Sequence, residues 1–183
     1  MIIARYHATR RRWGQSGLLA LCLLMLFAAP SLGVEHPDTA SAPKAEVRIT
    51  GKVGQPLVLT ETDIALLPQK SIDVSDDHGV HANYRGVALA SLLDRAKAPL
   101  GKDLRGRAMR LYLVVHAADG YEAVFALPEL DPAFTDKVVL LVNGRDSHPL
   151  SAEEGPFRII VPDEKRHARW VRQVTTLAIE EAQ

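Results

Sequence analysis

Basic side chains and a tryptophan crowd together near the end of the segment GPFRIIVPDEKRHARW, residues 155–170. Lys165, Arg166 and Arg169 follow an apolar run, and Trp170 comes directly after them. Arginine presents a planar fork of donors that suits phosphate oxygens, and tryptophan offers a flat apolar face. The segment therefore indicates either a site for an anionic ligand or an exposed loop whose cations are neutralised by nearby acids.

Two histidines three residues apart, His78 and His81, lie in the polar part of the segment 70–86. Neutral imidazole is a good ligand for zinc and copper, so this pair could bind either metal together with His116 or His148. Secure zinc signatures have more ligands at set spacing, and a polar loop with two exposed histidines explains the same residues. The sequence leaves both interpretations open.

The elements that must position these residues are short. Alternating or apolar runs bounded by turn residues predict strands at 47–51, 57–60, the start of 70–86, 109–117, 121–126, 137–144, 157–162 and 172–180. Helical spacing and capping signals predict helices at 60–68 and 87–96 and a short helical turn or loop at 127–134. Asp119-Gly120 between two of the strands predicts a tight hairpin turn. This order indicates an α+β domain with a mixed or antiparallel sheet and a few short helices.

The N-terminal residues 1–33 have the pattern of a secretory signal. A basic stretch with four arginines precedes the apolar segment 17–29, and small residues follow it at the expected cleavage site. This apolar segment is shorter than the roughly 20 residues of a membrane span, although an uncleaved anchor is an alternative. We therefore expect a signal peptide at 1–33, a polar linker at 34–45 and one domain at 46–183 in an exported, periplasmic protein. The general export route fits better than the twin-arginine route, which stays open.

Cleavage would change the charge and cysteine content. The leader contains four of the 22 basic residues and none of the 22 acidic ones, so 18 basic residues would remain and the net charge would be −4. An acidic chain does not have the basic surface of a nucleic-acid-binding protein. The single cysteine, Cys22, lies in the leader, so we expect neither disulfides nor thiolate ligands in the mature chain.

Three segments resemble the molybdopterin-binding oxidoreductase domain, the sulfite-oxidase-like family. They are YRGVALASLLDRA (84–96), ADGYEAVFALPEL (118–130) and VLLVNGRDSHPLSAEEGPFRIIVPDEKRHARWV (139–171). The family pattern has a Gly-Val-x-Leu-x-x-Leu-Leu helix, an Asn-Gly turn, a Gly-x-Pro-x-Arg strand ending in Val-Pro, and a cation–Trp pair. The resemblance extends over residues 46–180, and its C-terminal third is the most specific part.

The resemblance implies a single sulfite-oxidase-like domain that binds a pterin carrying a phosphate. In the family, molybdenum is held by the dithiolene of that pterin and by one protein cysteine. Arg169, the cation of the cation–Trp pair, would lie at the phosphate, with Arg158, Lys165 and Arg166 as further contacts. The resemblance therefore implies a small anionic ligand, molybdopterin or a related pterin.

This chain departs from the family where the metal ligand is expected. The segment 71–84, before the Gly-Val-x-Leu helix, contains no cysteine. Ser75 and Asp76 offer oxygen donors that a hard metal centre accepts, with His78 and His81 beside them, but a solvated turn explains the segment equally. Two functions are thus expected: a molybdopterin-binding oxidoreductase-like protein, or a non-catalytic periplasmic ligand-binding or sensory module. Either could work with a membrane-bound redox or sensor partner.

Overall fold

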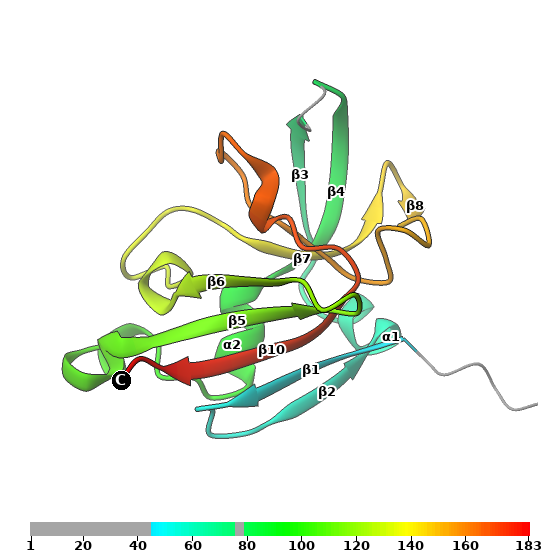
Figure 1. The fold of residues 1–183 in the computed structure, drawn as a ribbon. Coiled ribbons are helices and arrows are strands. Elements are labelled where there is room, and N and C mark those ends of the chain that lie inside the picture. The colour runs from blue at the N-terminus through cyan, green and yellow to red at the C-terminus, as the bar shows by residue number, and fades with distance from the viewer. Residues whose placement is uncertain (1–44, 76–78) are drawn as a thin grey trace, which may run out of the picture. The chain divides into compact units, whose positions relative to one another are not determined.

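The computed structural model describes residues 45–75 and 79–183, which form two sheets and a few short helices (Figure 1). The first sheet has the order β2-β1-β10-β5-β6. Its strands are β1 (Glu46–Gly51), β2 (Leu57–Thr60), β5 (Leu111–Ala117), β6 (Glu122–Ala126) and β10 (Val174–Glu181). The sheet is mixed because β1 and β10 run parallel, whereas the other neighbours are antiparallel.

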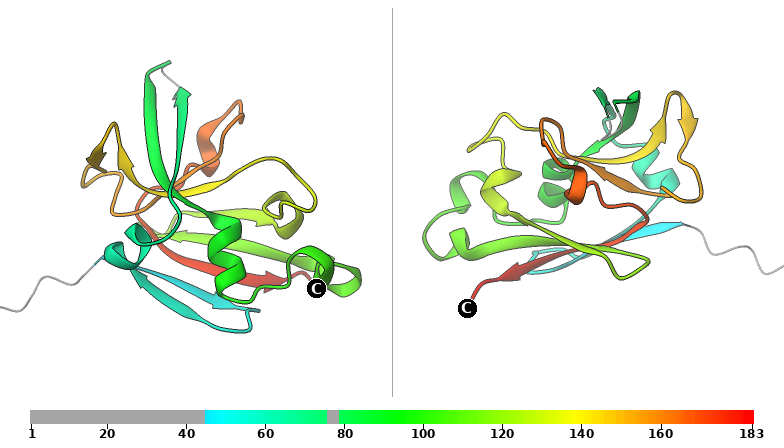
Figure 2. Two further views of the ribbon diagram at one scale, coloured as in Figure 1. Left: turned by 180° about the vertical axis from the view of Figure 1, so that it is seen from behind. Right: turned by 45° about the horizontal axis from the view of Figure 1, so that its top comes forward.

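The second sheet is antiparallel and carries much of the site described below. It has the order β3-β4-β7-β8, and β9 also pairs with β7. Its strands are β3 (Lys70–Ser75), β4 (His81–Ala88), β7 (Leu140–Arg145), β8 (His148–Pro149) and β9 (Arg158–Ile160). Figure 2 shows the two sheets and the helices from behind and with the top of the molecule turned toward the viewer.

One continuous apolar core joins both sheets. Buried Ile49 and Leu177 from the first sheet share this core with Leu141 and Ile159 from the second. Helix α2 (Leu89–Arg95) adds three buried leucines, Leu89, Leu92 and Leu93, along one side. Residues three and four apart share one helix face, which explains why these leucines point into the core together.

The remaining elements are short and end at clear local signals. Helix α1 (Glu61–Ala65) begins with a capping box in which Thr60 and Asp63 exchange side-chain and backbone hydrogen bonds. The described residues also contain four short 3-10 helices: η1 (Gly101–Asp103), η2 (Gly106–Arg110), η3 (Leu127–Glu129) and η4 (His167–Arg169). No helix among residues 45–75 and 79–183 is long and apolar enough to cross a membrane.

The predicted α+β fold class is confirmed, including the hairpin turn at Asp119-Gly120 between β5 and β6. The second half of the segment 70–86 differs from the predicted polar loop, because His81–Ala88 forms β4 and pairs with both β3 and β7. Within β4, Gly86 lies so close to β7 that a Cβ there would be 2.1 Å from the Leu141 carbonyl oxygen. The predicted leader and all but the last residue of the predicted linker lie outside the described residues.

Candidate functional site

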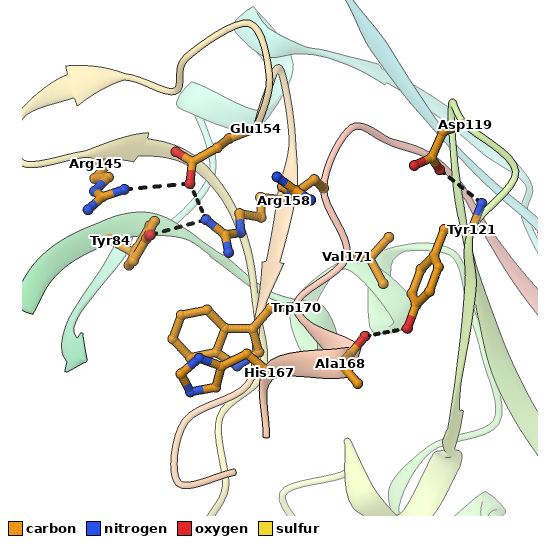
Figure 3. Close-up of a pocket in the computed structure, with 11 residues that line it drawn as sticks. Tyr84, Asp119, Tyr121, Arg145, Glu154, Arg158, His167, Ala168, Trp170 and Val171 are labelled. Carbon is orange, nitrogen blue, oxygen red and sulfur yellow. Dashed lines mark hydrogen bonds and ion pairs between the residues drawn. The ribbon is translucent and has the colours of Figure 1, made fainter. Parts of the chain in front are cut away.

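A cavity of about 460 Å³ opens where the ends of several strands meet (Figure 3). Its lining comes from β4, β7, the turn between β8 and β9, β9, the β5–β6 turn, η4 and the segment after η4. The lining residues are Tyr84, Asp119, Tyr121, Arg145, Glu154, Arg158, His167, Ala168, Trp170, Val171 and Arg172. Charged, aromatic and backbone groups thus surround one space, which is typical of a small-molecule site.

One acid that lines the cavity is shared by two arginines (Figure 3). Glu154 Oε1 forms an ion pair with Arg158 Nη1 and lies 3.5 Å from Arg145 Nη1. The same Arg158 nitrogen donates a hydrogen bond of 3.2 Å to the hydroxyl oxygen of buried Tyr84. Arg158 is largely buried, with 12% of its side chain exposed, so these contacts hold its guanidinium in one place.

Aromatic rings form one wall of the cavity. The imidazole of His167 stacks on the indole of Trp170, with ring centroids 3.8 Å apart and an interplanar angle of 18°. Tyr84 meets the same indole edge-on at 6.1 Å. The Arg158 guanidinium lies 5.6 Å from both the Tyr84 and the Trp170 ring centroids. Tyr84 and Trp170 are buried, so the half-buried His167 is the ring of this wall most open to a planar ligand, next to a cation that suits an anionic one.

Hydrogen bonds to backbone carbonyl oxygens fix both Trp170 and η4 in place. The indole Nε1 of Trp170 donates a 2.8 Å hydrogen bond to the Val161 carbonyl oxygen, and the side chain is buried. The hydroxyl of Tyr121, from the β5–β6 hairpin, donates a 2.8 Å hydrogen bond to the Ala168 carbonyl oxygen. The hairpin that Asp119-Gly120 makes therefore also positions η4 at the cavity.

Arg158 and Arg169, both predicted as anion contacts, lie in different places. Arg158 lines the cavity, and its Nε is buried without a hydrogen-bond partner in the described part of the chain. Arg169 is not among the lining residues. Its Nε donates to Glu164 at 2.8 Å, and its Nη1 donates to Glu129 at 3.0 Å and to the Val124 carbonyl oxygen at 3.2 Å.

The environment of Arg169 ties η4 to the first sheet. Its guanidinium lies 4.3 Å from the centroid of the buried Phe125 ring on β6. Burial disfavours its charged form, but hydrogen bonds to Glu164 and Glu129 raise the pKa of Arg169 above its ordinary value. The role of Arg169 at a phosphate stays a prediction. Lys165 and Arg166 are exposed and do not line the cavity, and their role also stays a prediction.

The residues predicted as metal ligands are only partly described. Ser75 Oγ lies 3.0 Å from His81 Nδ1 at the tip of the β3–β4 hairpin, whereas Asp76 and His78 lie outside the described residues. His116 lies 2.8 Å from a Glu122 carboxylate oxygen, away from that tip. Within 45–75 and 79–183, no group of three or more His, Cys, Asp or Glu side chains is placed to hold a metal.

Several cavity residues had no functional assignment from the sequence. Glu154 is one of them, and it is largely buried with 16% of its side chain exposed. Tyr84 stood in the predicted polar loop and instead lies on β4. The signal for Tyr84 was the alternation Ala82, Tyr84, Gly86, whose members all face inward. Glu154 lies in the turn before β9, where no periodic pattern marks a buried position, although its partner Arg158 follows only four residues later.

Comparisons with known proteins agree with this fold. The family model described as "Oxidoreductase molybdopterin binding domain" matches residues 34–183. No curated protein sequence matches the chain. Among solved structures, the chain is similar to the sulfane dehydrogenase SoxCD from Paracoccus pantotrophus, with a TM-score of 0.58 and 20% sequence identity. That match covers 75% of this chain and 38% of the SoxCD chain. Because the family model matches most of the sequence, the chain belongs to the oxidoreductase molybdopterin-binding domain family.

Proposed function

We propose that this is an exported protein that binds a small anionic heterocycle, molybdopterin or a related pterin, in the cavity around Arg158. The observation that carries the proposal is the orphaned Nε of Arg158, a buried donor beside the flat faces of Trp170 and Tyr84. A buried donor without a partner is costly, and a ligand oxygen would satisfy it. Family membership points to a pterin with a phosphate as the ligand that has both features.

The cavity suits the phosphate and the planar ring of the family cofactor better than it suits the molybdenum. Its arginines suit a phosphate or another anionic group, and its aromatic wall suits a planar ring. A thiolate ligand for molybdenum is lacking from the described residues, because the single cysteine of the sequence is Cys22. We therefore assign the described residues a role in binding the ligand and derive no redox step from them.

A non-catalytic binding module is the second function we consider. The observation in its favour is that residues 45–75 and 79–183 contain no cysteine that could ligate molybdenum. In this function the same cavity would bind the anionic ligand and present it to a membrane-bound redox or sensor partner. The two functions share the ligand site and differ in whether molybdenum accompanies the pterin.

The deciding experiment is analysis of the protein purified from its native export compartment. Pterin would be measured by fluorescence after oxidative release, and molybdenum by mass spectrometry. We expect stoichiometric pterin in the wild-type protein and its loss in Arg158→Met, while Arg166→Met, which removes an exposed cation outside the cavity, retains it. Pterin together with molybdenum supports the oxidoreductase-like function, and pterin alone supports the binding module. Absence of pterin from well-folded wild-type protein would overturn both.

A further inference from the structure

Glu154 is an acid that lines the cavity and pairs with two of its arginines. Its Oε1 pairs with Arg158 and lies 3.5 Å from Arg145 Nη1, so one carboxylate oxygen takes the position between two guanidinium groups. An anionic ligand would use those same guanidinium donors, because they are the strongest anion-binding groups that line the cavity. The carboxylate of Glu154 thus already makes contacts of the kind that a ligand anion would make.

The backbone holds Glu154 in this position. Its N–H donates a 3.0 Å hydrogen bond to the Ser151 carbonyl oxygen, and its own carbonyl accepts a 3.0 Å hydrogen bond from the Gln173 N–H. The carboxylate is therefore tethered next to Arg158. A tethered group competes at a high effective concentration, so a free anion of similar strength displaces it only at a high concentration of its own.

Glu154 nevertheless leaves the arginines incompletely paired. Arg158 Nε has no hydrogen-bond partner within the described residues. Arg172, which also lines the cavity, is exposed and makes no ion pair with any described residue. A ligand with several anionic oxygens could satisfy donors that the single carboxylate of Glu154 leaves unused.

A second cavity gives the Glu154 side chain a place to turn. This cavity of about 450 Å³ shares Arg145, Glu154 and Arg172 with the first one and is otherwise lined mostly by polar residues of the 146–153 turn. Because Glu154 lines both spaces, the second cavity is the space that its carboxylate would enter on leaving Arg158. Arg145 and Arg172 border the second cavity too, so a displaced carboxylate keeps cationic neighbours there.

We propose that Glu154 is an autoinhibitory internal anion, which the anionic group of the ligand must displace from Arg158 and Arg145. This inference rests on the proposed function and adds a regulatory element to the same site. Glu154 thereby sets the threshold for ligand binding and favours ligands with several anionic oxygens, such as a phosphate, over weaker anions. Any partner that drew Glu154 toward the second cavity would raise the affinity for the ligand.

The test compares Glu154→Gln with its neighbour Glu153→Gln. Both changes remove one negative charge, but Glu153 is exposed and lines only the second cavity, which makes it a matched control. The probe is phenyl phosphate, which combines an aromatic ring with a phosphate, measured by titration calorimetry on the full chain. We expect Glu154→Gln to bind it about tenfold more tightly than wild type, because the internal competitor has lost its charge. Glu153→Gln should bind it like wild type.

A second variant is needed because the glutamine of Glu154→Gln could still accept a hydrogen bond from Arg158. Glu154→Ala removes the side chain altogether and should also bind the probe more tightly, with circular dichroism confirming the fold. Unchanged or weaker binding in both Glu154 variants, beside measurable binding by wild type, would show that Glu154 positions Arg158 instead of competing for it. That result overturns this inference and leaves the proposed function standing. If wild type and all variants fail to bind the probe, the proposed anion site itself is overturned.

Discussion

Arg158 and Arg169 lie in the same short segment and have the same side chain, yet their surroundings differ in kind. Arg158 faces the cavity, shares Glu154 with Arg145 and retains a buried Nε without a partner in the described chain. Arg169 lies on Phe125 and distributes its donors over two glutamates and a backbone carbonyl. An arginine with a nitrogen that has no hydrogen-bond partner is thus a candidate ligand contact. An arginine whose nitrogens all donate hydrogen bonds within the protein is a structural link.

The difference arises from where the acidic partners come from. Val124 belongs to β6 and Glu129 belongs to η3, and the β5–β6 hairpin brings both beside η4. Their contacts with Arg169 join the first sheet to the segment that carries Trp170. Arg158 instead meets Tyr84 and Glu154 at the edge of the second sheet, next to open space. The comparison therefore predicts that Arg158 contributes mainly to ligand affinity and that Arg169 contributes mainly to the stability of the fold.

The largest expected effect is the loss of ligand affinity in Arg158→Met. Methionine keeps much of the length of the side chain but removes the charge and every donor. Hydrogen bonds to charged groups contribute about 1.5–3 kcal/mol, so the affinity for phenyl phosphate should fall about 10- to 100-fold. Titration calorimetry measures the change. Arg169→Met is the paired control and should change the affinity less than about threefold, since Arg169 does not line the cavity.

Equal losses of affinity in the two variants would erase the distinction between the two arginines. Such a result would show that Arg169 leaves Glu164 and Glu129 to contact the ligand, and it would support the predicted role of Arg169 at the phosphate. A loss confined to Arg169→Met would reverse the comparison, making Arg158 the structural residue.

A smaller effect, on stability, is expected for Arg169→Met. The substitution breaks hydrogen bonds to Glu164 and Glu129 and leaves Glu164, with 19% of its side chain exposed, near an apolar ring. Because 31% of the Arg169 side chain is exposed, solvent screens part of these interactions. We expect the free energy of unfolding to fall by about 1–2 kcal/mol, measured by urea denaturation.

The control for this stability effect is Arg172→Met. Arg172 is exposed and has no ion-pair partner in the described chain, so its replacement should leave the urea midpoint unchanged. Equal destabilisation by both substitutions would mean that a general change in charge, and not the contacts of Arg169, causes the loss.

Local sequence signals predicted much of the fold. The capping box at Thr60 and the hairpin at Asp119-Gly120 depend on residues a few positions apart, and both are present in the structure. The strand β4 was missed because polar His81, Asn83 and Arg85 conceal the inward-facing alternation of their neighbours. Helix α2 consequently begins two residues later than its apolar spacing indicated.

The site was less predictable because its contacts join residues that are far apart in the chain. The family resemblance predicted Arg158 as a ligand contact; Arg158 lines the cavity, and its contact with a ligand stays a prediction. Nothing local distinguished it from Arg169, whose partner Glu129 precedes it by 40 positions. Likewise, Tyr84 and Arg158 meet only because β4 and β9 flank the same strand, β7.

A modest effect is expected for Tyr84→Phe, which tests how Arg158 is held. The change removes the hydroxyl that accepts the 3.2 Å hydrogen bond from Arg158 but keeps the buried ring against Trp170. We expect the free energy of unfolding to fall by about 0.5–1.5 kcal/mol, measured by urea denaturation. Phenyl phosphate affinity should fall less than in Arg158→Met, because the guanidinium remains. An affinity loss as large as that of Arg158→Met would show that the Tyr84 hydroxyl contacts the ligand directly.

The smallest expected effect concerns a third arginine, Arg107, whose side chain is 80% exposed and pairs with Glu181 at 2.6 Å. The hydrogen bond from Arg107 is the main reason that the pKa of Glu181 lies below its ordinary value, and the charges of Arg107 and Arg110 add to it. A carboxylate with a lowered pKa stabilises the fold above its unfolded pKa, and this stabilisation is lost as the pH falls through the folded pKa. In Arg107→Ala the pKa of Glu181 should therefore rise toward its ordinary value, and the stabilisation that this pair contributes above the unfolded pKa of Glu181 should be lost.

Nuclear magnetic resonance titration of the Glu181 carboxyl carbon measures this shift directly. Arg110 Nη1 stays 3.9 Å from Glu181, so we expect the pKa to recover only in part, and Arg110→Ala alone should raise it less than Arg107→Ala does. At neutral pH, where this contribution is fully present, Arg107→Ala should lower the urea midpoint only slightly, because solvent screens an exposed pair, and it should leave ligand affinity unchanged. A neutral-pH loss of stability as large as that of Arg169→Met would contradict the ranking of the three arginines by burial. Exposure would then matter less than the geometry of each pair, and the contrast between Arg158 and Arg169 would have to rest on their unused donors alone.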